Sequence, residues 1–386
     1  MMARKSLQYV VKLSKYCNLR CSYCYEFESL GDKKRMSPEL LEAIFTHARD
    51  FARDEELARI RFSWHGGEPF MVPVEQYRQI GALQRRVFDG KIPIQNVAQT
   101  NLTILPEKLL DFLKHGDFFQ GIGISFDVQG DQRIDRQGLP SAQKTLDNLQ
   151  TIIDHEIDFG AITVLARNTI SHVEAIFNFY DRLGIPFRLL PFYLSAYDEQ
   201  IEQHAITQGE LVEAMKLTFD LWMMSDNPLS IDPLDDYIDH AVDFLTGNKQ
   251  FIYNKDADEI VFIIDIDGSV SGMADTYDPV RTYGNLGTMT MHDIIVSPGR
   301  RIALDECQSR MARHCNNCPY YGYCPGHFVA EATPAQRPAM VVHGCPARAV
   351  IDHIVERLSG FDDLSAILPA VRRCRTADAS QHRPVY

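Results

Sequence analysis

Apolar and polar positions alternate in two different ways along the first half of the chain. Short segments with an apolar residue at every second position, such as residues 7–13, predict β-strands. Longer segments with apolar residues three or four positions apart predict α-helices, and the two kinds of segment follow one another in turn. This succession predicts a parallel sheet with right-handed helical crossovers. The predicted strands are 7–13, 60–64, 95–100, 121–126, 161–166 and 187–193, and the predicted helices between them are 37–53, 74–88, 106–115, 141–155 and 170–183.

The pattern changes beyond residue 205. Two segments predict bridging helices, an alternating segment predicts a strand that leads into a hairpin, and a cysteine-rich stretch precedes a closing helix. We therefore expect an α/β fold: an open, partial barrel of six β/α units with a small cysteine-rich C-terminal extension. In such a barrel the chemistry belongs at the carboxyl ends of the strands. The expected divisions are 1–205 for the barrel, 206–258 for the helical bridge, 259–350 for the cysteine-rich domain and 351–386 for the closing helix and tail.

Composition restricts the possible functions. The net charge of −13 argues against a nucleic-acid partner, because phosphate binding needs clustered Lys and Arg. No apolar run approaches the ~20 residues of a membrane span, and no signal peptide precedes the first strand, so we expect a cytoplasmic protein without a membrane partner. In that compartment nine cysteines are better interpreted as metal ligands than as a disulfide framework.

Three of the cysteines, Cys17, Cys21 and Cys24, follow the first predicted strand within eight residues. A compact loop can direct all three sulfurs at one point. A [4Fe–4S] cluster held by protein alone takes four cysteines, so three would leave one iron open to chelate a small molecule. The alternative is a zinc site, but no further Cys or His follows the triplet until His47.

Polar and glycine residues end the next three predicted strands. Gly66 and Gly67 would let the backbone approach a zwitterionic ligand closely, and Glu68 could accept a hydrogen bond from its ammonium group. The alternative for this segment is an ordinary turn. The remaining candidates are Tyr23 in the cysteine loop, which could pack on an adenine ring, and four strand-end residues that could bind the ribose and carboxylate of such a ligand, namely Gln99, Asn101, Ser125 and Asp127. Simple packing for Tyr23, and helix caps or turns for the other four, are the alternatives.

A second group consists of Cys315, Cys318, Cys324 and Cys345. Four thiolates with a long final gap can enclose a metal completely, and the spacing alone is compatible with a structural zinc ion or a closed [4Fe–4S] cluster. Two cysteines are left over. We interpret Cys307 as a buried free thiol rather than an exchangeable ligand, and Cys374 as unliganded in a basic tail.

Together these motifs resemble the radical S-adenosylmethionine (SAM) enzymes with a C-terminal SPASM-type extension, over about residues 7–355. The resemblance rests on the first three cysteines, the His65–Pro69 segment, Gln99-Thr100-Asn101, Ser125-Phe126-Asp127 and the four late cysteines. It implies a first [4Fe–4S] cluster whose open iron binds SAM, and it favours iron over zinc at the late site. A full SPASM domain has seven cysteines for two auxiliary clusters, whereas Ala274 and Phe328 stand here where two of them are expected. We therefore expect one auxiliary [4Fe–4S] cluster.

Within this family the closest likeness is to the maturases of ribosomal peptides that form cyclophanes. The shared features are Trp64–Pro69, Arg133–Gly138 and Asp267–Asp275. The resemblance implies that a 5′-deoxyadenosyl radical abstracts a side-chain hydrogen of a precursor peptide, and that the carbon radical joins an aromatic ring. The resemblance also implies Asp275 as a candidate base, with a turn-capping carboxylate as the alternative, and an external electron donor as a second partner. Two alternatives remain, a sulfatase-type maturase that makes formylglycine and a non-catalytic iron–sulfur or zinc scaffold that binds peptides.

Overall fold

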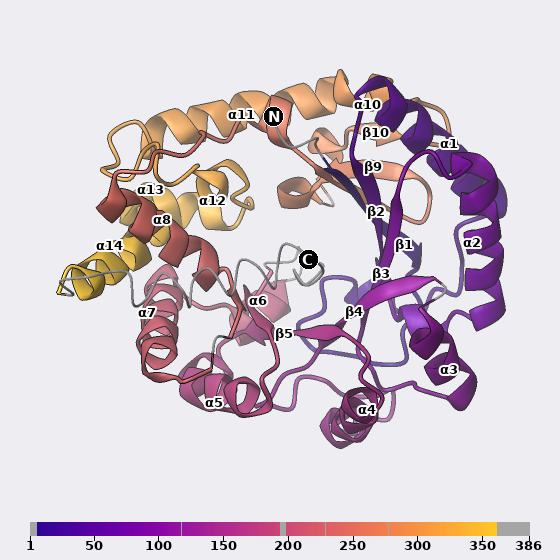
Figure 1. Cartoon of the computed structure of the whole chain (residues 1–386), viewed down its shortest axis with the longest axis horizontal. Coiled ribbons are helices and arrows are strands. Elements are labelled where there is room, and N and C mark those ends of the chain that lie inside the picture. Colours follow the sequence, from indigo (N-terminus) through magenta and orange to yellow (C-terminus); the bar gives the residue numbers. More distant parts are fainter. Residues whose placement is uncertain (1–5, 117, 194–197, 228, 277, 361–386) are drawn as a thin grey trace.

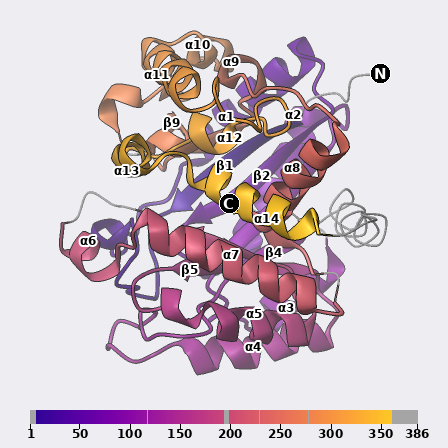
Figure 2. The same cartoon turned by 90° about the vertical axis from the view of Figure 1, so that its left-hand side faces the viewer.

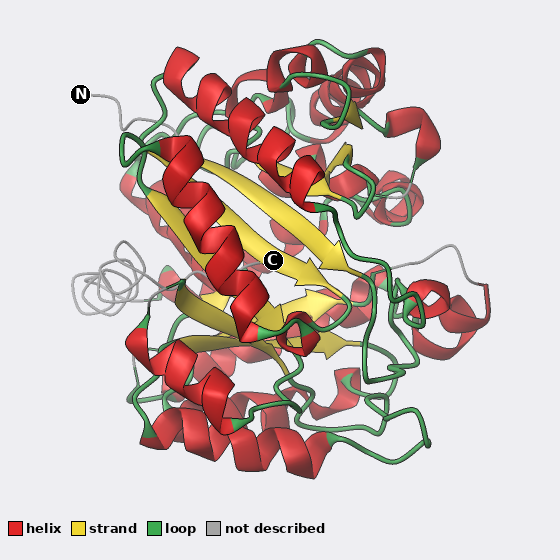
Figure 3. Cartoon of the chain, turned by 90° about the vertical axis from the view of Figure 1, so that its right-hand side faces the viewer, coloured by secondary structure: helices red, strands yellow, loops and turns green. Residues whose placement is uncertain are grey.

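A single ten-stranded sheet organises the computed structural model, which describes residues 6–116, 118–193, 198–227, 229–276 and 278–360 (Figures 1 and 3). The strand order is β10-β9-β8-β1-β2-β3-β4-β5-β6-β7, and strands β1 to β7 are parallel to their neighbours. The first six strands confirm the predicted succession. Their bounds are β1 Ser6–Ser14, β2 Arg59–Gly66, β3 Ile94–Thr100, β4 Phe119–Ser125, β5 Phe159–Leu165 and β6 Phe187–Pro191.

Five amphipathic helices cover the outer face of these strands (Figure 1). Their termini follow the capping rules: the Ser37 hydroxyl accepts a hydrogen bond from the Leu40 N–H at the start of the first helix, and Gly116 and Gly184 end two others with φ of 63° and 64°. The helices are α1 Pro38–Asp54, α2 Val74–Phe88, α3 Glu107–His115, α4 Ala142–Asp154 and α5 Val173–Leu183, with the short 3₁₀ segments Phe27–Ser29, Pro69–Met71 and Ile170–His172 between elements.

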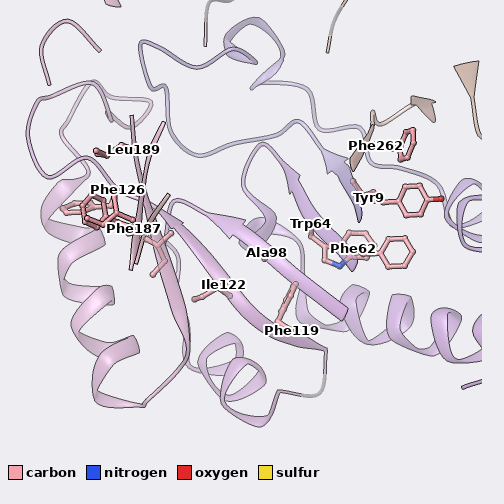
Figure 4. Packing of buried hydrophobic residues seen from close by; sticks show 14 of the residues in the cluster. Tyr9, Phe62, Trp64, Ala98, Phe119, Ile122, Phe126, Phe187, Leu189 and Phe262 are labelled. Atoms are coloured by element: carbon pink, nitrogen blue, oxygen red, sulfur yellow. The ribbon is translucent and has the colours of Figure 1, made fainter. Parts of the chain in front are cut away.

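The main hydrophobic core lies between the outer face of the sheet and these helices (Figure 4). Along β1, Tyr9 and Val11 are fully buried there, and Tyr9 stacks on Phe62 of β2 with ring centroids 5.6 Å apart. The intervening residues of the same strands point to the opposite face, because side chains alternate across a sheet. Several of those inward residues are polar, among them Gln8 and Lys12.

The C-terminal part of the chain continues the same sheet. Strand β8 (Val261–Ile264) pairs with β1 in parallel, and β9 (Ser269–Gly272) turns back antiparallel to β8 at the predicted Asp267-Gly268 turn. At the other edge the two-residue strand β7 (Ile231–Asp232) joins β6. The expected boundaries at 205 and 259 therefore fall inside one continuous sheet.

Helices close the cavity side of the sheet. Helix α14 (Pro346–Leu358) packs on both bridge helices, α7 (Gln208–Met224) and α8 (Leu234–Thr246), which were predicted (Figure 2). The long helix α11 (Pro298–His314) was not predicted. The remaining elements are α6 Asp198–His204, α9 Lys255–Asp258, β10 Gly284–Asn285, α10 Met291–Ile295, α12 His327–Ala330 and α13 Gln336–His343, with 3₁₀ segments Met273–Asp275 and Pro279–Arg281. Cys374 and the expected tail lie outside the described residues. Among those residues no helix is long and apolar enough to span a membrane.

Candidate active site

A cavity of about 900 Å³ lies against the inner face of the sheet. At one end it is lined by the three early cysteines and by the carboxyl ends of the first strands. At the other end it is lined by Cys324 and by residues of α12, including Phe328 and Glu331. This volume is near the upper end for small-molecule sites, so there is room for a cofactor and a substrate together.

The loop that follows β1 brings Cys17, Cys21 and Cys24 to the cavity wall. Burial is the main cause that raises the pKa of the Cys17 thiol, to about 12, and neighbouring Glu68 and Cys21 add to it. The pKa of Cys24 is also raised, first by burial and then by Cys21 and Cys17. The three thiols therefore lie close enough to affect one another, as ligands of one cluster must. Cluster binding would replace their protons, since thiolates are the ligands.

Neighbouring segments fix this loop from two sides. On one side, the Arg20 and Ser22 N–H groups donate to the carbonyls of Ile134 and Gln132, at 2.7 and 3.0 Å. On the other side, the Gln200 amide of α6 donates to the carbonyls of Ser22 and Cys24, at 2.9 and 3.1 Å. The segment around residues 133–138, which the sequence singled out, thus serves as the backbone partner of the cysteine loop.

Gly66 and Gly67 allow two backbones to touch. A Cβ on Gly66 would come within 2.2 Å of the Ser14 carbonyl oxygen, and one on Gly67 within 2.2 Å of the Tyr16 carbonyl oxygen. Gly66 also has a φ of 117°, which favours glycine. Both glycines line the cavity, as expected, but the close approach is to the chain leaving β1. Their immediate role is to place the start of the cysteine loop.

Glu68 joins the ends of two strands. Its buried carboxylate accepts hydrogen bonds from the Phe70 N–H at 2.8 Å, the Thr100 hydroxyl at 2.7 Å and the Asn101 N–H at 2.8 Å. Burial raises the pKa of Glu68, although these hydrogen bonds oppose the effect. The side chain lines the cavity, but most of its hydrogen-bonding capacity is used within the protein.

Three predicted strand-end residues also line the cavity. The Gln99 amide donates to the Ser125 hydroxyl at 2.8 Å, so these two residues form one polar unit between β3 and β4. Asn101 instead directs its amide nitrogen to the Asn18 side chain, at 3.1 Å, and to the Cys17 sulfur, at 3.8 Å. Asn101 is therefore placed to donate a hydrogen bond to a cluster ligand.

Asp127 lies behind the cavity wall rather than in it. Its carboxylate accepts from the Tyr23 hydroxyl at 2.5 Å, from the Arg133 guanidinium at 3.0 Å and from the Val164 N–H at 3.1 Å. Arg133 and Tyr23 themselves line the cavity, and the Arg133 guanidinium lies 5.5 Å from the centre of the Tyr23 ring. Asp127 thus positions these two side chains, one of which, Arg133, the sequence did not identify as a candidate.

Lys12 and His65 are further cavity residues that sequence reasoning missed. They are register partners on β1 and β2. Lys12 is only 2% exposed and its ammonium lies 2.8 Å from the Glu26 carboxylate. Burial and the nearby Lys12 lower the pKa of His65 to about 4, so the imidazole is neutral at pH 7. The sequence feature that could have identified them is the polar side chain that each strand carries on its inward-facing, alternate positions.

The four late cysteines gather around a cavity of about 30 Å³. Cys315 follows the last residue of α11, and Cys345 precedes the first residue of α14, so one end of each helix lies at this site. Burial, followed by the other three thiols, raises the pKa of Cys315 to about 12. Backbone N–H groups at the start of α14 favour the Cys345 thiolate, in opposition to burial. Cys307 is buried in α11, as expected for a structural thiol.

A buried ion-pair network adjoins Phe328, one of the two positions at which the resemblance leads us to expect a cysteine. Lys255 bridges Glu259 at 2.9 Å and Glu331 at 2.7 Å, and Arg300 binds Glu259 from the other side at 3.0 Å. Each of these four side chains is no more than 6% exposed. Tyr253, which donates to Glu331 at 2.7 Å, belongs to the same small cluster as Phe328. Ala274 and Phe328 supply no metal donor, so these residues do not fit a first auxiliary cluster.

Asp275 is 1% exposed and is held by arginines. The Arg337 guanidinium donates to its carboxylate at 2.8 Å, and Arg281 lies 3.8 Å away. The adjacent Ala274 and Thr276 line the cavity, whereas the Asp275 side chain lies behind them. Tyr193 does line the cavity; burial, followed by the charge of Asp275, raises its pKa to about 12.

No group of three His, Cys, Asp or Glu side chains in the described part of the chain converges on one metal ion. Thiolates on a single zinc ion each lie about 2.3 Å from it, whereas a four-iron cluster spreads its ligands over a wider sphere. Within each of the two cysteine groups, the thiols are nevertheless close enough to raise one another's pKa.

Comparison with known proteins agrees with this geometry. Residues 11–180, from β1 to α5, match the Radical SAM superfamily. This region is a radical SAM domain, and the chain is a radical SAM enzyme. Its cofactors are accordingly SAM and iron–sulfur clusters. The three early cysteines fit the SAM-binding [4Fe–4S] cluster, and the four late cysteines fit one auxiliary [4Fe–4S] cluster.

The relatives extend beyond the radical SAM domain. The enzyme is 26% identical over 341 residues to a cysteine-type anaerobic sulfatase-maturating enzyme of Clostridium novyi, covering 83% of this chain and 87% of the relative. A serine-type anaerobic sulfatase-maturating enzyme of Bacteroides thetaiotaomicron is 27% identical over 187 residues, which are 46% of this chain and 44% of that protein.

Two solved structures have the same fold. The structure of anSMEcpe with bound AdoMet and the Cp18Cys peptide superposes with a TM-score of 0.70 at 20% identity, covering 96% of this chain and 99% of that one. Streptococcus suis SuiB bound to its precursor peptide SuiA superposes with a TM-score of 0.56 at 13% identity, covering 89% and 74%.

Proposed function

We propose that this radical SAM enzyme modifies a ribosomally made precursor peptide, and that it joins an aromatic ring carbon to a side-chain carbon of the same peptide. Peptide modification is supported by the sulfatase-maturating relatives and by two structural neighbours that were solved with peptides. When bound, SAM and the reduced first cluster supply a 5′-deoxyadenosyl radical that abstracts a hydrogen atom from the substrate.

The observation that carries the cross-linking proposal is the replacement at the first auxiliary site. The three early cysteines line the cavity together, which supports a shared first step of hydrogen abstraction. By contrast, Ala274 and Phe328 stand where the resemblance leads us to expect two further cysteines, so ligands of one auxiliary cluster are missing. Because this difference concerns an auxiliary cluster and not the first one, we infer that the reaction departs from formylglycine formation after the radical has formed.

The chain's own residues divide the work. Arg133 and Tyr23, held by Asp127, form one wall beside the early cysteines, and the Gln99–Ser125 pair forms the floor next to them. We propose that these groups orient SAM. The rest of the cavity, towards Cys324, would hold the peptide and exclude water from the substrate radical. We assign proton removal to Asp275 acting through the cavity residue Tyr193.

The test is anaerobic reconstitution followed by incubation with dithionite, SAM and candidate precursor peptides encoded beside the gene. Loss of two hydrogens from the peptide, with tandem spectra that show a cross-link between two side chains, supports the proposal. Conversion of serine to formylglycine also removes two hydrogens, so the product is treated with an aldehyde-reactive probe as well. A labelled aldehyde without a cross-link would establish the formylglycine alternative instead.

A further inference from the structure

Three cations surround one tyrosine on the outer side of the cysteine loop. The Arg136 guanidinium lies 4.5 Å from the centre of the Tyr16 ring, and the Lys33 ammonium lies 5.6 Å from it. Arg136 also donates a hydrogen bond to the Tyr16 hydroxyl, and Arg20 is close enough for its charge to interact with that hydroxyl. We call Arg20, Lys33, Arg136 and Tyr16 the basic patch.

The basic patch lies directly over a cluster ligand. Cys17 is the next residue after Tyr16, and its carbonyl oxygen accepts hydrogen bonds from Arg20 at 3.0 Å and from Arg136 at 2.8 Å. Cys17 itself is 7% exposed. The patch is therefore the solvent side of the same peptide segment whose thiol faces the cavity.

The basic patch is positively charged, whereas the whole protein has a negative net charge. The chain carries a net charge of −13, yet Lys33 and Arg136 are exposed, and within the described residues no carboxylate pairs with Arg20, Lys33 or Arg136. Two acids lie in the same loops, but Asp32 accepts the Lys34 N–H and Asp135 accepts the Gln137 and Leu139 N–H groups. A local positive patch attracts an acidic partner, while the negative charge of the rest of the protein repels that partner elsewhere on the surface.

Two exposed apolar side chains lie in the same two loops as the cations. Phe27, three residues after Cys24, is 42% exposed, and Leu139, in the loop of Arg136, is 61% exposed. The two loops are joined by a backbone bridge between Leu19 and Asp135. Exposed apolar side chains in loops that also carry cations without carboxylate partners are typical of a transient protein interface.

We propose that the basic patch docks a small acidic electron-transfer protein that reduces the first cluster. An acidic carrier seated on Tyr16 would be one residue away from Cys17, at the outer side of the cluster loop. The proposal depends only on the need of the radical SAM reaction for one external electron per SAM cleaved, so it does not rest on the identity of the peptide. The carrier is oxidised by one electron, and the first cluster is reduced by one.

The test compares two sources of electrons in the absence of peptide. Formation of 5′-deoxyadenosine from SAM is measured with dithionite and with a reduced acidic flavodoxin, at increasing sodium chloride concentration. The test variant is Lys33→Glu, because among the described residues the Lys33 ammonium contacts only the ring of Tyr16. The control is Lys114→Glu, which makes the same charge change in the last turn of α3, just before the start of β4 and thus at the end of the strands opposite to the cysteine loop.

For the wild type we expect a flavodoxin-driven rate that falls as salt rises. Lys33→Glu should lower that rate about ten-fold at low salt and weaken its salt dependence, with an unchanged dithionite-driven rate. Lys114→Glu should behave as the wild type. Arg136→Gln, which removes a charge without adding one, should give a smaller loss in the same direction.

Three results would overturn the proposal. The first is a flavodoxin-driven rate of Lys33→Glu equal to that of the wild type. The second is an equal loss of this rate in Lys33→Glu and Lys114→Glu. The third is a loss in Lys33→Glu that is equally large when dithionite supplies the electrons. If the flavodoxin rate persists while the precursor peptide binds less tightly to Lys33→Glu, the patch belongs to the peptide instead.

Discussion

The Lys255 ammonium lies 2.7 Å from the Glu331 carboxylate, and the two side chains are 2% and 6% exposed. Lys255 belongs to α9, and Glu331, which directly follows α12, lies 76 residues away in sequence. Glu331 also lines the large cavity, so the pair joins the cavity wall to the cysteine-rich region. This ion pair, together with hydrogen bonds from Tyr253 and Tyr283, holds the two segments together in the interior.

Replacing Lys255 by Met should therefore destabilise the protein strongly. The variant leaves Glu259 and Glu331 buried without their shared cation, and breaking a buried pair costs about 3–5 kcal/mol. The free energy of unfolding, measured with urea under anaerobic conditions, checks this. Lys249→Met, at an exposed position of the neighbouring loop, is the control. A loss below about 1 kcal/mol for Lys255→Met would contradict the structural role of the network.

The same pair predicts a dependence on pH. Burial alone would raise the pKa of Glu331, but Lys255 outweighs it, and the folded-state pKa is lowered below the usual 4.5. A carboxyl group of this kind stabilises the fold above its unfolded pKa, and the contribution disappears as pH falls through the folded pKa. Compared with the wild type, Glu331→Gln should thus lower the melting temperature more at pH 7 than near pH 4. An equal deficit at both pH values would exclude an ionised Glu331 as the cause.

Gly67→Ala should displace the cysteine loop. The added methyl group would lie 2.2 Å from the Tyr16 carbonyl oxygen and 2.4 Å from that of Lys15, so the backbone before Cys17 has to move. We expect loss of the SAM-dependent change in the electron paramagnetic resonance spectrum of the reduced first cluster, with the late cluster retained. Gly209→Ala in α7, whose methyl group would approach no atom closer than 3.9 Å, is the matched control. Normal SAM binding by Gly67→Ala would show that the close approach is not required.

Iron content tests the assignment of the late cysteines. Two [4Fe–4S] clusters correspond to about eight irons per chain, and Cys324→Ala should lower this to about four. Cys307→Ala should keep about eight, because Cys307 is buried in α11 outside the 30 Å³ cavity that the other four thiols line. If the wild type contains stoichiometric zinc and only half of the expected iron, the late cysteines hold a zinc ion and not an iron–sulfur cluster. Loss of iron in Cys307→Ala would show that the Cys307 thiol is a cluster ligand.

The sequence predicted the elements that bury one regular apolar face, and it missed those that do not. Strands β1 to β6 and helices α1 to α5 have such a face and were found. Helix α11 was missed because its buried stripe includes Arg300 and Cys307, which interrupt the apolar period. The polar positions of β1 were recognised, but alternation alone does not distinguish a solvent-facing surface from an internal cavity. For this reason Lys12 and His65 were not identified as cavity residues.

The predicted site residues were located better than their contacts. Short spacing and strand ends identified the three early cysteines, the two glycines and Gln99 with Ser125, all of which meet at the cavity. Asp127 and Glu68 were expected to face the ligand, yet they hold Arg133 and Asn101, from segments six and thirty-three residues away in sequence. Such partners depend on how strand ends and loops pack, and one sequence contains no direct signal for that.

Asp275→Asn tests whether this carboxylate removes a proton after the radical has formed. The variant keeps the size of the side chain but loses the charge that Arg337 binds at 2.8 Å. If Asp275 is the base, hydrogen abstraction should persist, and deuterium from a labelled peptide should still appear in 5′-deoxyadenosine. Formation of the cross-linked product should fall by about 10²- to 10⁴-fold, as is usual when a general base is lost.

Because the Asp275→Asn variant also disturbs Arg337, Glu306→Gln is the control. Glu306 lies 3.2 Å from the same guanidinium, and its loss loosens Arg337 while Asp275 stays intact. A product loss shared by both variants would assign the effect to the arginine contacts, and full cross-linking by Asp275→Asn would remove the base assignment. Tyr193→Phe separates the two parts of the proposed route, since it should slow product formation only if the proton passes from the cavity to Asp275 through that hydroxyl.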